Sequence, residues 1–151
     1  MKKLTYNIDI KAPANLVVDQ MIGKETYSQW TSLFSPTSDF EGGWNKGDKI
    51  RFTAMDERGT RQGILAEIVE HIPHQFISMH HYGYLYGDQE ITEGPELAVL
   101  ENSFENYYFD QKDGITNLRI EVSDDGEHTK HMNEIWPKAL EKLKAMCENK
   151  A

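Results

Sequence analysis

The sequence predicts an α+β fold in which a curved antiparallel sheet of about six to seven strands wraps around a long C-terminal helix. Three observations predict it. Several segments alternate apolar and polar residues, as half-buried strands do. Two short stretches with helical spacing follow the first of these segments. One apolar stripe then runs along residues 130–149, and a sheet and a helix with one apolar face each pack on one another.

The N-terminal third is expected to hold one strand and two short helices. Leu4 to Ile10 alternate in polarity, which indicates a half-buried strand. Pro13 suits the first turn of a helix, where its missing N–H costs nothing, and Gly23 ends that helix. A second helical piece is expected over residues 26–33. It carries three aromatic side chains on neighbouring turns: Tyr27, Trp30 and Phe34.

Strands and turns are expected from residue 35 onward. Residues 41–48 contain three glycines and are typical of a hairpin or a bulged loop. An Asp-Gly turn at residues 113–114 joins the last two predicted strands. Alternating polarity predicts strands over residues 49–55, 62–71, 75–82, 101–111 and 116–123.

Residues 83–100 are the least regular part of the sequence, with Gly83, Gly87, Gly94 and Pro95. Long loops in small domains are often functional or mobile. We therefore expect a long loop that lies over the mouth of a cavity between the sheet and the helix.

The C-terminal segment predicts one helix from about Lys130 to Asn149. Pro137 removes one backbone hydrogen bond, so a bend is expected just before it. Apolar residues at intervals of three and four form one stripe along the helix: Met132, Ile135, Trp136, Ala139, Leu140, Leu143 and Met146.

Composition limits the possible partners. The formal net charge is −9 and no basic face is evident, which argues against nucleic acid. No segment approaches the ~20 apolar residues of a membrane-spanning helix, and the first residues lack the apolar run of a signal peptide. One cysteine, Cys147, excludes a disulfide within the chain. We expect a single domain over residues 1–151, located in the cytoplasm, while the oligomeric state stays open.

Four features together resemble a known family: Ala12-Pro13 after the first strand, Tyr27-Ser28-Gln29-Trp30, Gly42-Gly43-Trp44, and the segment from Trp136 to Leu143. They are similar to the START-like (SRPBCC, or Bet v 1-like) superfamily. Within it, the sequence most resembles bacterial domains related to the C-terminal region of the activator of the heat-shock-protein-90 ATPase. The resemblance implies a helix-grip fold around an apolar pocket. Members include lipid carriers, receptors, cyclases and co-chaperones, so function has to be argued from the site.

Histidines and carboxylates offer the main candidates for chemistry. His80 and His81 are adjacent in a predicted strand, so they point to opposite faces and cannot share a metal ion. One of them should face the cavity, either as an acid or base or as a histidine paired with a neighbouring group. Glu101 and Glu105 have the same strand parity, and we expect them to be solvated or paired within a hairpin. No metal site, cofactor or catalytic residue is assigned.

The aromatic residues favour binding of a small apolar or aromatic molecule between the sheet and the helix. A protein partner, as the co-chaperone resemblance implies, is the first alternative. A cyclase or dehydratase that uses His81 is the second, and whether the protein is an enzyme stays open. The candidate cavity-lining residues are Trp30, Phe34, Trp44, Phe52, Met79, His81, Tyr107, Phe109, Leu118, Ile120, Trp136 and Leu140.

Overall fold

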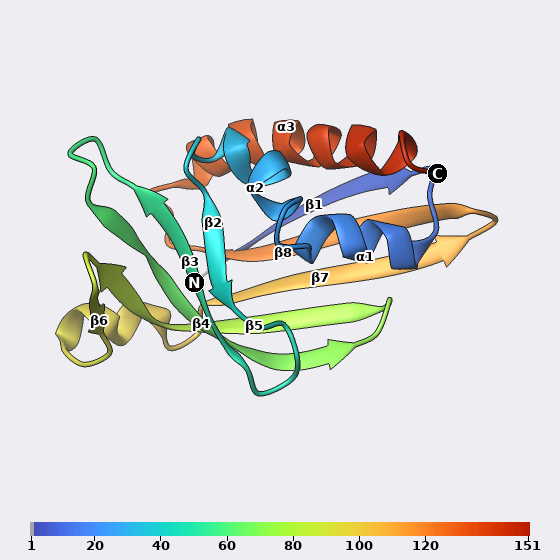
Figure 1. Ribbon diagram of the computed structural model, residues 1–151. Coiled ribbons are helices and arrows are strands. Elements are labelled where there is room, and N and C mark those ends of the chain that lie inside the picture. The colour runs from blue at the N-terminus through green and yellow to red at the C-terminus, as the bar shows by residue number, and fades with distance from the viewer. Residues whose placement is uncertain (1) are drawn as a thin grey trace.

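The computed structural model of the protein describes residues 2–151 and confirms the predicted α+β fold (Figure 1). The strands are β1 (Lys2–Ile10), β2 (Asp39–Gly42), β3 (Lys49–Met55), β4 (Arg61–Ile72), β5 (Phe76–Tyr86), β6 (Gln89–Ile91), β7 (Phe104–Lys112) and β8 (Ile115–Asp124). The helices are α1 (Ala14–Ile22), α2 (Tyr27–Trp30) and α3 (Thr129–Glu148), with 3₁₀ turns η1 (Thr31–Leu33) and η2 (Pro95–Leu100).

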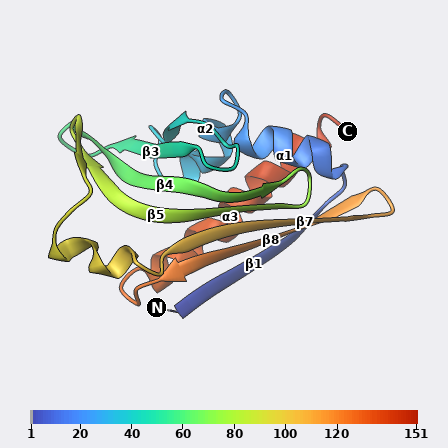
Figure 2. The same ribbon diagram turned by 90° about the horizontal axis from the view of Figure 1, so that it is seen from below.

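Within these residues, seven antiparallel strands form one sheet in the order β1-β8-β7-β5-β4-β3-β2, and the short β6 pairs with β5. The helices α1, α2 and α3 lie on the same face of the sheet (Figures 1 and 2). The two predicted short helices after the first strand are therefore confirmed, although the second is split into α2 and η1.

The pairing between β4 and β5 is irregular at two points. Tyr82 of β5 has no partner where the register shifts between Leu65 and Ala66, and Val69 of β4 has none between Ile68 and Glu70. Such bulges increase strand twist and bending. A side chain at Gly63 would place Cβ only 1.8 Å from the carbonyl oxygen of Phe52 in β3. Glycine at this position therefore lets β3 and β4 approach closely where the sheet bends.

A packed core lies at the middle of the sheet, where strand residues meet α3. Apolar side chains that alternate along β8 all point inward, as the pattern of the sequence predicts. The stripe of α3 covers them. Fully buried members of this core include Ile10, Ile68, Met79, Leu118, Ile120, Ala139 and Leu143.

Helix α3 begins and ends one residue before the predicted bounds and continues through Pro137. The predicted bend before Pro137 stays a prediction. Trp136 and Leu140 are buried, while Lys138 and Glu141 on the opposite side are exposed. The segment is therefore amphipathic, as predicted. None of the helices within residues 2–151 has the length and apolar character needed to cross a membrane.

The prediction of a long irregular loop over residues 83–100 is wrong. β5 continues to Tyr86, a turn at Gly87 leads into β6, and η2 completes the segment. The alternation of Tyr84, buried Leu85 and Tyr86 continues the strand, but the glycines and Pro95 hide this pattern in the sequence. Gly87 has a positive φ of 62°, which is the conformation that the tight turn requires.

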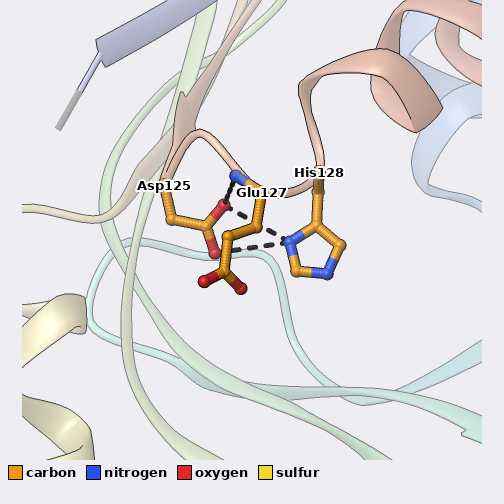
Figure 3. Close-up of side chains that lie close together, drawn as sticks. All are labelled: Asp125, Glu127 and His128. Carbon is orange, nitrogen blue, oxygen red and sulfur yellow. Dashed lines mark hydrogen bonds and ion pairs between the residues drawn. The ribbon is translucent and has the colours of Figure 1, made fainter.

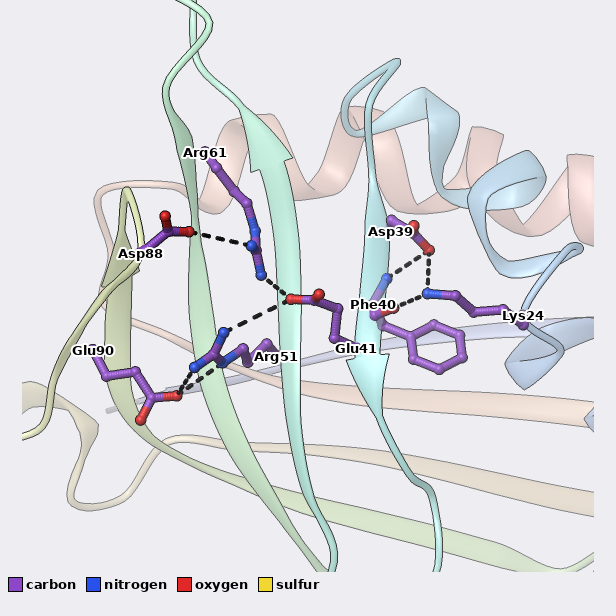
Figure 4. A network of polar contacts seen from close by, with 8 residues as sticks. All are labelled: Lys24, Asp39, Phe40, Glu41, Arg51, Arg61, Asp88 and Glu90. Atoms are coloured by element: carbon purple, nitrogen blue, oxygen red, sulfur yellow. Dashed lines mark hydrogen bonds and ion pairs between the residues drawn. The ribbon is translucent and has the colours of Figure 1, made fainter.

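Ion pairs on the outside of the sheet connect β6 with β2, β3 and β4 (Figure 4). Arg51 donates to Glu90 in β6 at 2.7 and 2.8 Å, and Arg61 pairs with Glu41 in β2. At the other end of β2, Lys24 contacts Asp39 at 3.2 Å. These groups are partly exposed, so each pair contributes at most about 1 kcal/mol and mainly orients the edge strands.

Candidate functional site

A cavity of about 190 Å³ lies between the helices and the inner face of the sheet. Aromatic rings form most of its wall, and few polar groups reach it. This composition is typical of a site for a small molecule. The lining residues are Tyr27, Trp30, Thr31, Phe34, Ser38, Phe52, Ile64, His81, Glu105, Tyr107, Met132 and Trp136.

The helical side of the cavity is built around Trp30. Its indole N–H donates to the carbonyl oxygen of Met21 at 2.9 Å, which attaches α2 to the end of α1. Its ring lies 6.0 Å from that of Trp136 in α3, and the Trp136 ring lies 5.0 Å from that of Phe34. Aromatic pairs at such distances fix the mutual orientation of the rings. The wall is therefore held in place by contacts between three helical segments.

The polar end of the cavity lies on β7. Glu105 and Tyr107 are two residues apart on this strand and face inward together, and the Tyr107 hydroxyl donates to the Glu105 carboxylate. Burial raises the pKa of Glu105 above its usual value, and the hydrogen bond from Tyr107 offsets only part of this effect. Burial, together with the nearby Glu105 carboxylate, also raises the pKa of Tyr107.

His81 lines the cavity from β5. Its Nδ1 lies 2.8 Å from the hydroxyl oxygen of Ser103, and its backbone N–H donates to the Ser103 carbonyl at 3.0 Å. Burial lowers the pKa of His81 to about 4, with a smaller contribution from His80. The imidazole is therefore neutral at pH 7 and is paired with a hydroxyl group. His80 points to the other face and contacts the carbonyl oxygens of Leu100 and Glu101, as strand alternation predicts.

We expect Glu105→Gln to stabilise the protein more strongly at high pH than at low pH. The pKa of Glu105 is higher in the folded protein than in the unfolded chain, so the unfolded chain loses the carboxyl proton at a lower pH. The stability of the protein therefore falls as the pH rises from the pKa of an ordinary glutamate to the raised pKa of the folded state. Glutamine accepts the same hydrogen bond from Tyr107 but carries no charge. Urea unfolding of both proteins between about pH 5 and pH 8 measures the effect. A constant difference across this range would contradict it.

The structure places half of the twelve predicted lining residues at the cavity: Trp30, Phe34, Phe52, His81, Tyr107 and Trp136. The other half lie in the packed core instead: Trp44, Met79, Phe109, Leu118, Ile120 and Leu140. All six residues are buried, with at most 9% of each exposed. Trp44, for example, packs between the rings of Phe40 and Phe52, at 5.4 and 5.8 Å.

Two expectations about the neighbourhood of the cavity need correction. Glu101 and Glu105 do not share a strand, because β7 begins only at Phe104, and Glu105 is a cavity residue rather than a solvated one. The segment 83–100 contributes no residue to the lining. Its Tyr84, Val99 and Leu100 instead border a neighbouring pocket, which shares Ile64, His81 and Met132 with the cavity.

Sequence reasoning did not assign Tyr27, Thr31, Ser38, Ile64, Glu105 or Met132 to the site. For two of them a signal existed. Glu105 shares strand parity with Tyr107, which was assigned to the cavity, and Met132 lies one helical turn before Trp136 on the same stripe. Ser38 lies between elements, where no periodicity predicts the direction of a side chain.

Asp125, Glu127 and His128 form an exposed cluster before α3, with possible ligand atoms within 4.8 Å of one another (Figure 3). The Asp125 carboxylate accepts the Glu127 backbone N–H at 2.8 Å and lies 3.3 Å from His128 Nδ1. These contacts lower the pKa of Asp125. They organise the turn into α3, and we assign no ion to the cluster.

Comparisons with known structures support the fold. The Aha1 dimer from Colwellia psychrerythraea is similar, with a TM-score of 0.71, 19% identity, and coverage of 98% of this chain and 97% of that one. Protein NE0264 from Nitrosomonas europaea gives a TM-score of 0.73 at 13% identity, covering 99% and 96% of the two chains. CalU16 from Micromonospora echinospora gives 0.63 at 14% identity, covering 96% and 75%. At these identities the similarity shows the fold alone.

No curated protein sequence matches the chain. The model of one family, described as activator of Hsp90 ATPase homolog 1-like protein, matches residues 11–148. This range includes every residue that lines the cavity. The helix-grip arrangement around a pocket, which the sequence resemblance implied, agrees with the match. The chain therefore belongs to the family of activator of Hsp90 ATPase homolog 1-like proteins, within the SRPBCC superfamily.

Proposed function

We propose that this protein binds a small aromatic or apolar molecule in the cavity between α3 and the sheet. The observation that carries the proposal is a cavity of about 190 Å³ whose wall is mainly aromatic and whose polar groups lie on β5 and β7. An engineered cavity of about 150 Å³ in another protein is large enough to hold benzene. The volume therefore suits a single ring with a short substituent.

Benzyl alcohol is a suitable probe, because it combines one aromatic ring with one short polar arm. We expect saturable binding, measured by changes in tryptophan fluorescence and by ligand-observed NMR. Trp30 and Trp136 lie in the wall, so a bound ring changes their emission. Absence of saturable binding of this probe and of a neutral analogue such as toluene would contradict the proposal.

Ile64→Trp is expected to weaken binding of benzyl alcohol by more than about tenfold. Ile64 is half-buried at the border of the cavity, so a larger side chain there fills the space that the ring would occupy. Ile115→Trp is the matched control, because Ile115 is exposed at the β7–β8 turn, far from the lining residues. Equal affinities of the two variants would show that the ring binds elsewhere.

The family favours a second candidate function, the binding of a protein partner. The family description names activators of the Hsp90 ATPase, and the similar protein from Colwellia psychrerythraea is described as a dimer. We propose that an ATPase of this type is the partner to test first. An increase in its ATP turnover on adding the purified chain would support this function, and an unchanged rate would count against it. Catalysis through His81 is disfavoured, since a histidine with a pKa of about 4 is a weak general base.

A further inference from the structure

The only carboxyl group in the cavity lining of the described residues belongs to Glu105, and that lining contains no lysine or arginine. His81 is the one lining side chain that could become cationic, and it is neutral at pH 7. Within residues 2–151, the Glu105 carboxylate has a hydrogen bond from Tyr107 but no ion pair. The cavity can therefore carry a negative charge that no side chain balances.

A buried carboxylate without a cationic partner is costly, because the protein interior solvates it less well than water does. The raised pKa of Glu105, caused mainly by burial, reflects this cost. A ligand that brings a positive charge removes part of the cost by forming the missing ion pair. A ligand that brings a second negative charge adds to it.

The aromatic residues of the lining are a second feature that favours a cation. An ammonium group close to the face of tryptophan, tyrosine or phenylalanine is attracted by the ring quadrupole, more strongly where water is excluded. Trp30, Trp136 and Tyr107 are each nine-tenths or more buried and line the same cavity as Glu105. A carboxylate and several rings around one space are the groups that recognise an organic ammonium ion.

We infer that the natural ligand of this cavity is a small aromatic amine, bound as its cation with the ammonium group at Glu105 and the ring among Trp30, Phe34 and Trp136. This inference rests on the proposed function. It narrows the ligand class from small aromatic molecules to those with one amine on a short arm. Aromatic acids, which have the same size and shape, are excluded by charge.

Three probes of nearly equal size separate charge from shape: benzylamine, benzyl alcohol and benzoate. At about pH 8 an alkylamine is still protonated, as lysine side chains are, and a pH above neutral favours the ionised form of the Glu105 carboxyl. We expect benzylammonium to bind about tenfold more tightly than benzyl alcohol, and benzoate to bind most weakly, when dissociation constants are measured by NMR titration.

Glu105→Gln should remove the preference for benzylammonium and keep the binding of benzyl alcohol. Glu67→Gln is the matched control, because Glu67 is an exposed carboxylate in β4, opposite His80 on the outer face of the sheet. It changes the net charge equally and should leave the preference intact. If Glu105→Gln does not fold, the relative affinities of the unmodified protein for the three probes test the amine inference on their own.

The possible outcomes distinguish the two levels of the proposal. Binding of benzyl alcohol without any preference for benzylammonium, or equally tight binding of benzoate, overturns the amine inference and leaves the proposed function standing. If Glu105→Gln still binds benzylammonium more tightly than benzyl alcohol, the amine inference is also overturned, because the ammonium group would then interact with a group other than Glu105. Failure of all three probes to bind overturns the proposed function as well.

Discussion

Replacing Trp30 by alanine is expected to lower the free energy of unfolding by about 3–5 kcal/mol, the usual cost of removing a large buried aromatic side chain. Trp30 is 1% exposed and contacts α1, α3 and the neighbouring ring of Tyr27. The substitution removes the hydrogen bond to the Met21 carbonyl and opens a void next to an existing cavity. Because that cavity already limits how far the wall can collapse, we expect a value toward the upper end of the range.

The control for this prediction is Leu33→Ala, three residues further along the chain. Leu33 is 37% exposed at the end of η1, so its loss should change stability by no more than about 1 kcal/mol. Urea unfolding followed by circular dichroism measures both variants. A loss of less than about 1 kcal/mol for Trp30→Ala would mean that residues 27–33 do not pack against α3 as the structure shows.

Acidification is expected to destabilise the protein through His81. The pKa of this imidazole is 6.5 in an unfolded chain and about 4 in the folded one. At pH values above 6.5 both states are neutral and the residue has no effect on the pH dependence. Between pH 6.5 and pH 4 only the unfolded state takes up the proton, so stability falls as pH falls. Since one unit of pKa difference corresponds to about 1.4 kcal/mol, the full loss is about 3 kcal/mol.

The measurement compares the unmodified protein with His81→Gln across this range of pH. Glutamine does not titrate, so the difference in stability between the two proteins should change by about 3 kcal/mol in favour of the variant. His131→Gln, on the exposed side of α3, is the control and should follow the unmodified protein. Protonation of Glu105 stabilises the folded protein at mildly acidic pH, which is opposite to the effect of His81. Because Glu105 is present in all three proteins, its contribution cancels when their stabilities are compared. Parallel curves for His81→Gln and the unmodified protein would disprove the role of His81.

The strands and the long helix could be predicted because their side chains follow simple periods. Leu118, Ile120 and Val122 alternate, and Trp136, Leu140 and Leu143 repeat at helical spacing, so burial leaves a direct trace in the sequence. The continuation of β5 to Tyr86 was not predicted, because the glycines and Pro95 suggest an irregular loop. Its pairing with β6 is a local hairpin across Gly87 and Asp88, so the available signal was the two-residue turn rather than the periodicity of the strands.

The lining of the cavity was predicted less well than the fold, for a different reason. Strand parity identifies the inner face, but it does not show whether an inward side chain borders a void or touches another side chain. Tyr107 and Phe109 share a face of β7, yet only Tyr107 reaches the cavity. Likewise, strand parity indicates that Glu105 faces the same side as Tyr107, but glutamate side chains are usually exposed, which favoured a position in solvent. Bulges such as those in β4 and β5 change the direction of neighbouring side chains, and they are not visible in the pattern of the sequence.

The pairing of β1 with β8 joins Lys2 to Asp124 and Ile10 to Thr116. During synthesis, β1 is therefore made well before its partner strand β8, and the other six strands are made in between. Contacts between residues so far apart in the sequence slow folding, and an unpaired strand can associate with other chains in the meantime. Helix α3 follows β8 in the chain, so the inner face of the sheet is covered by this helix only after both β1 and β8 have been made.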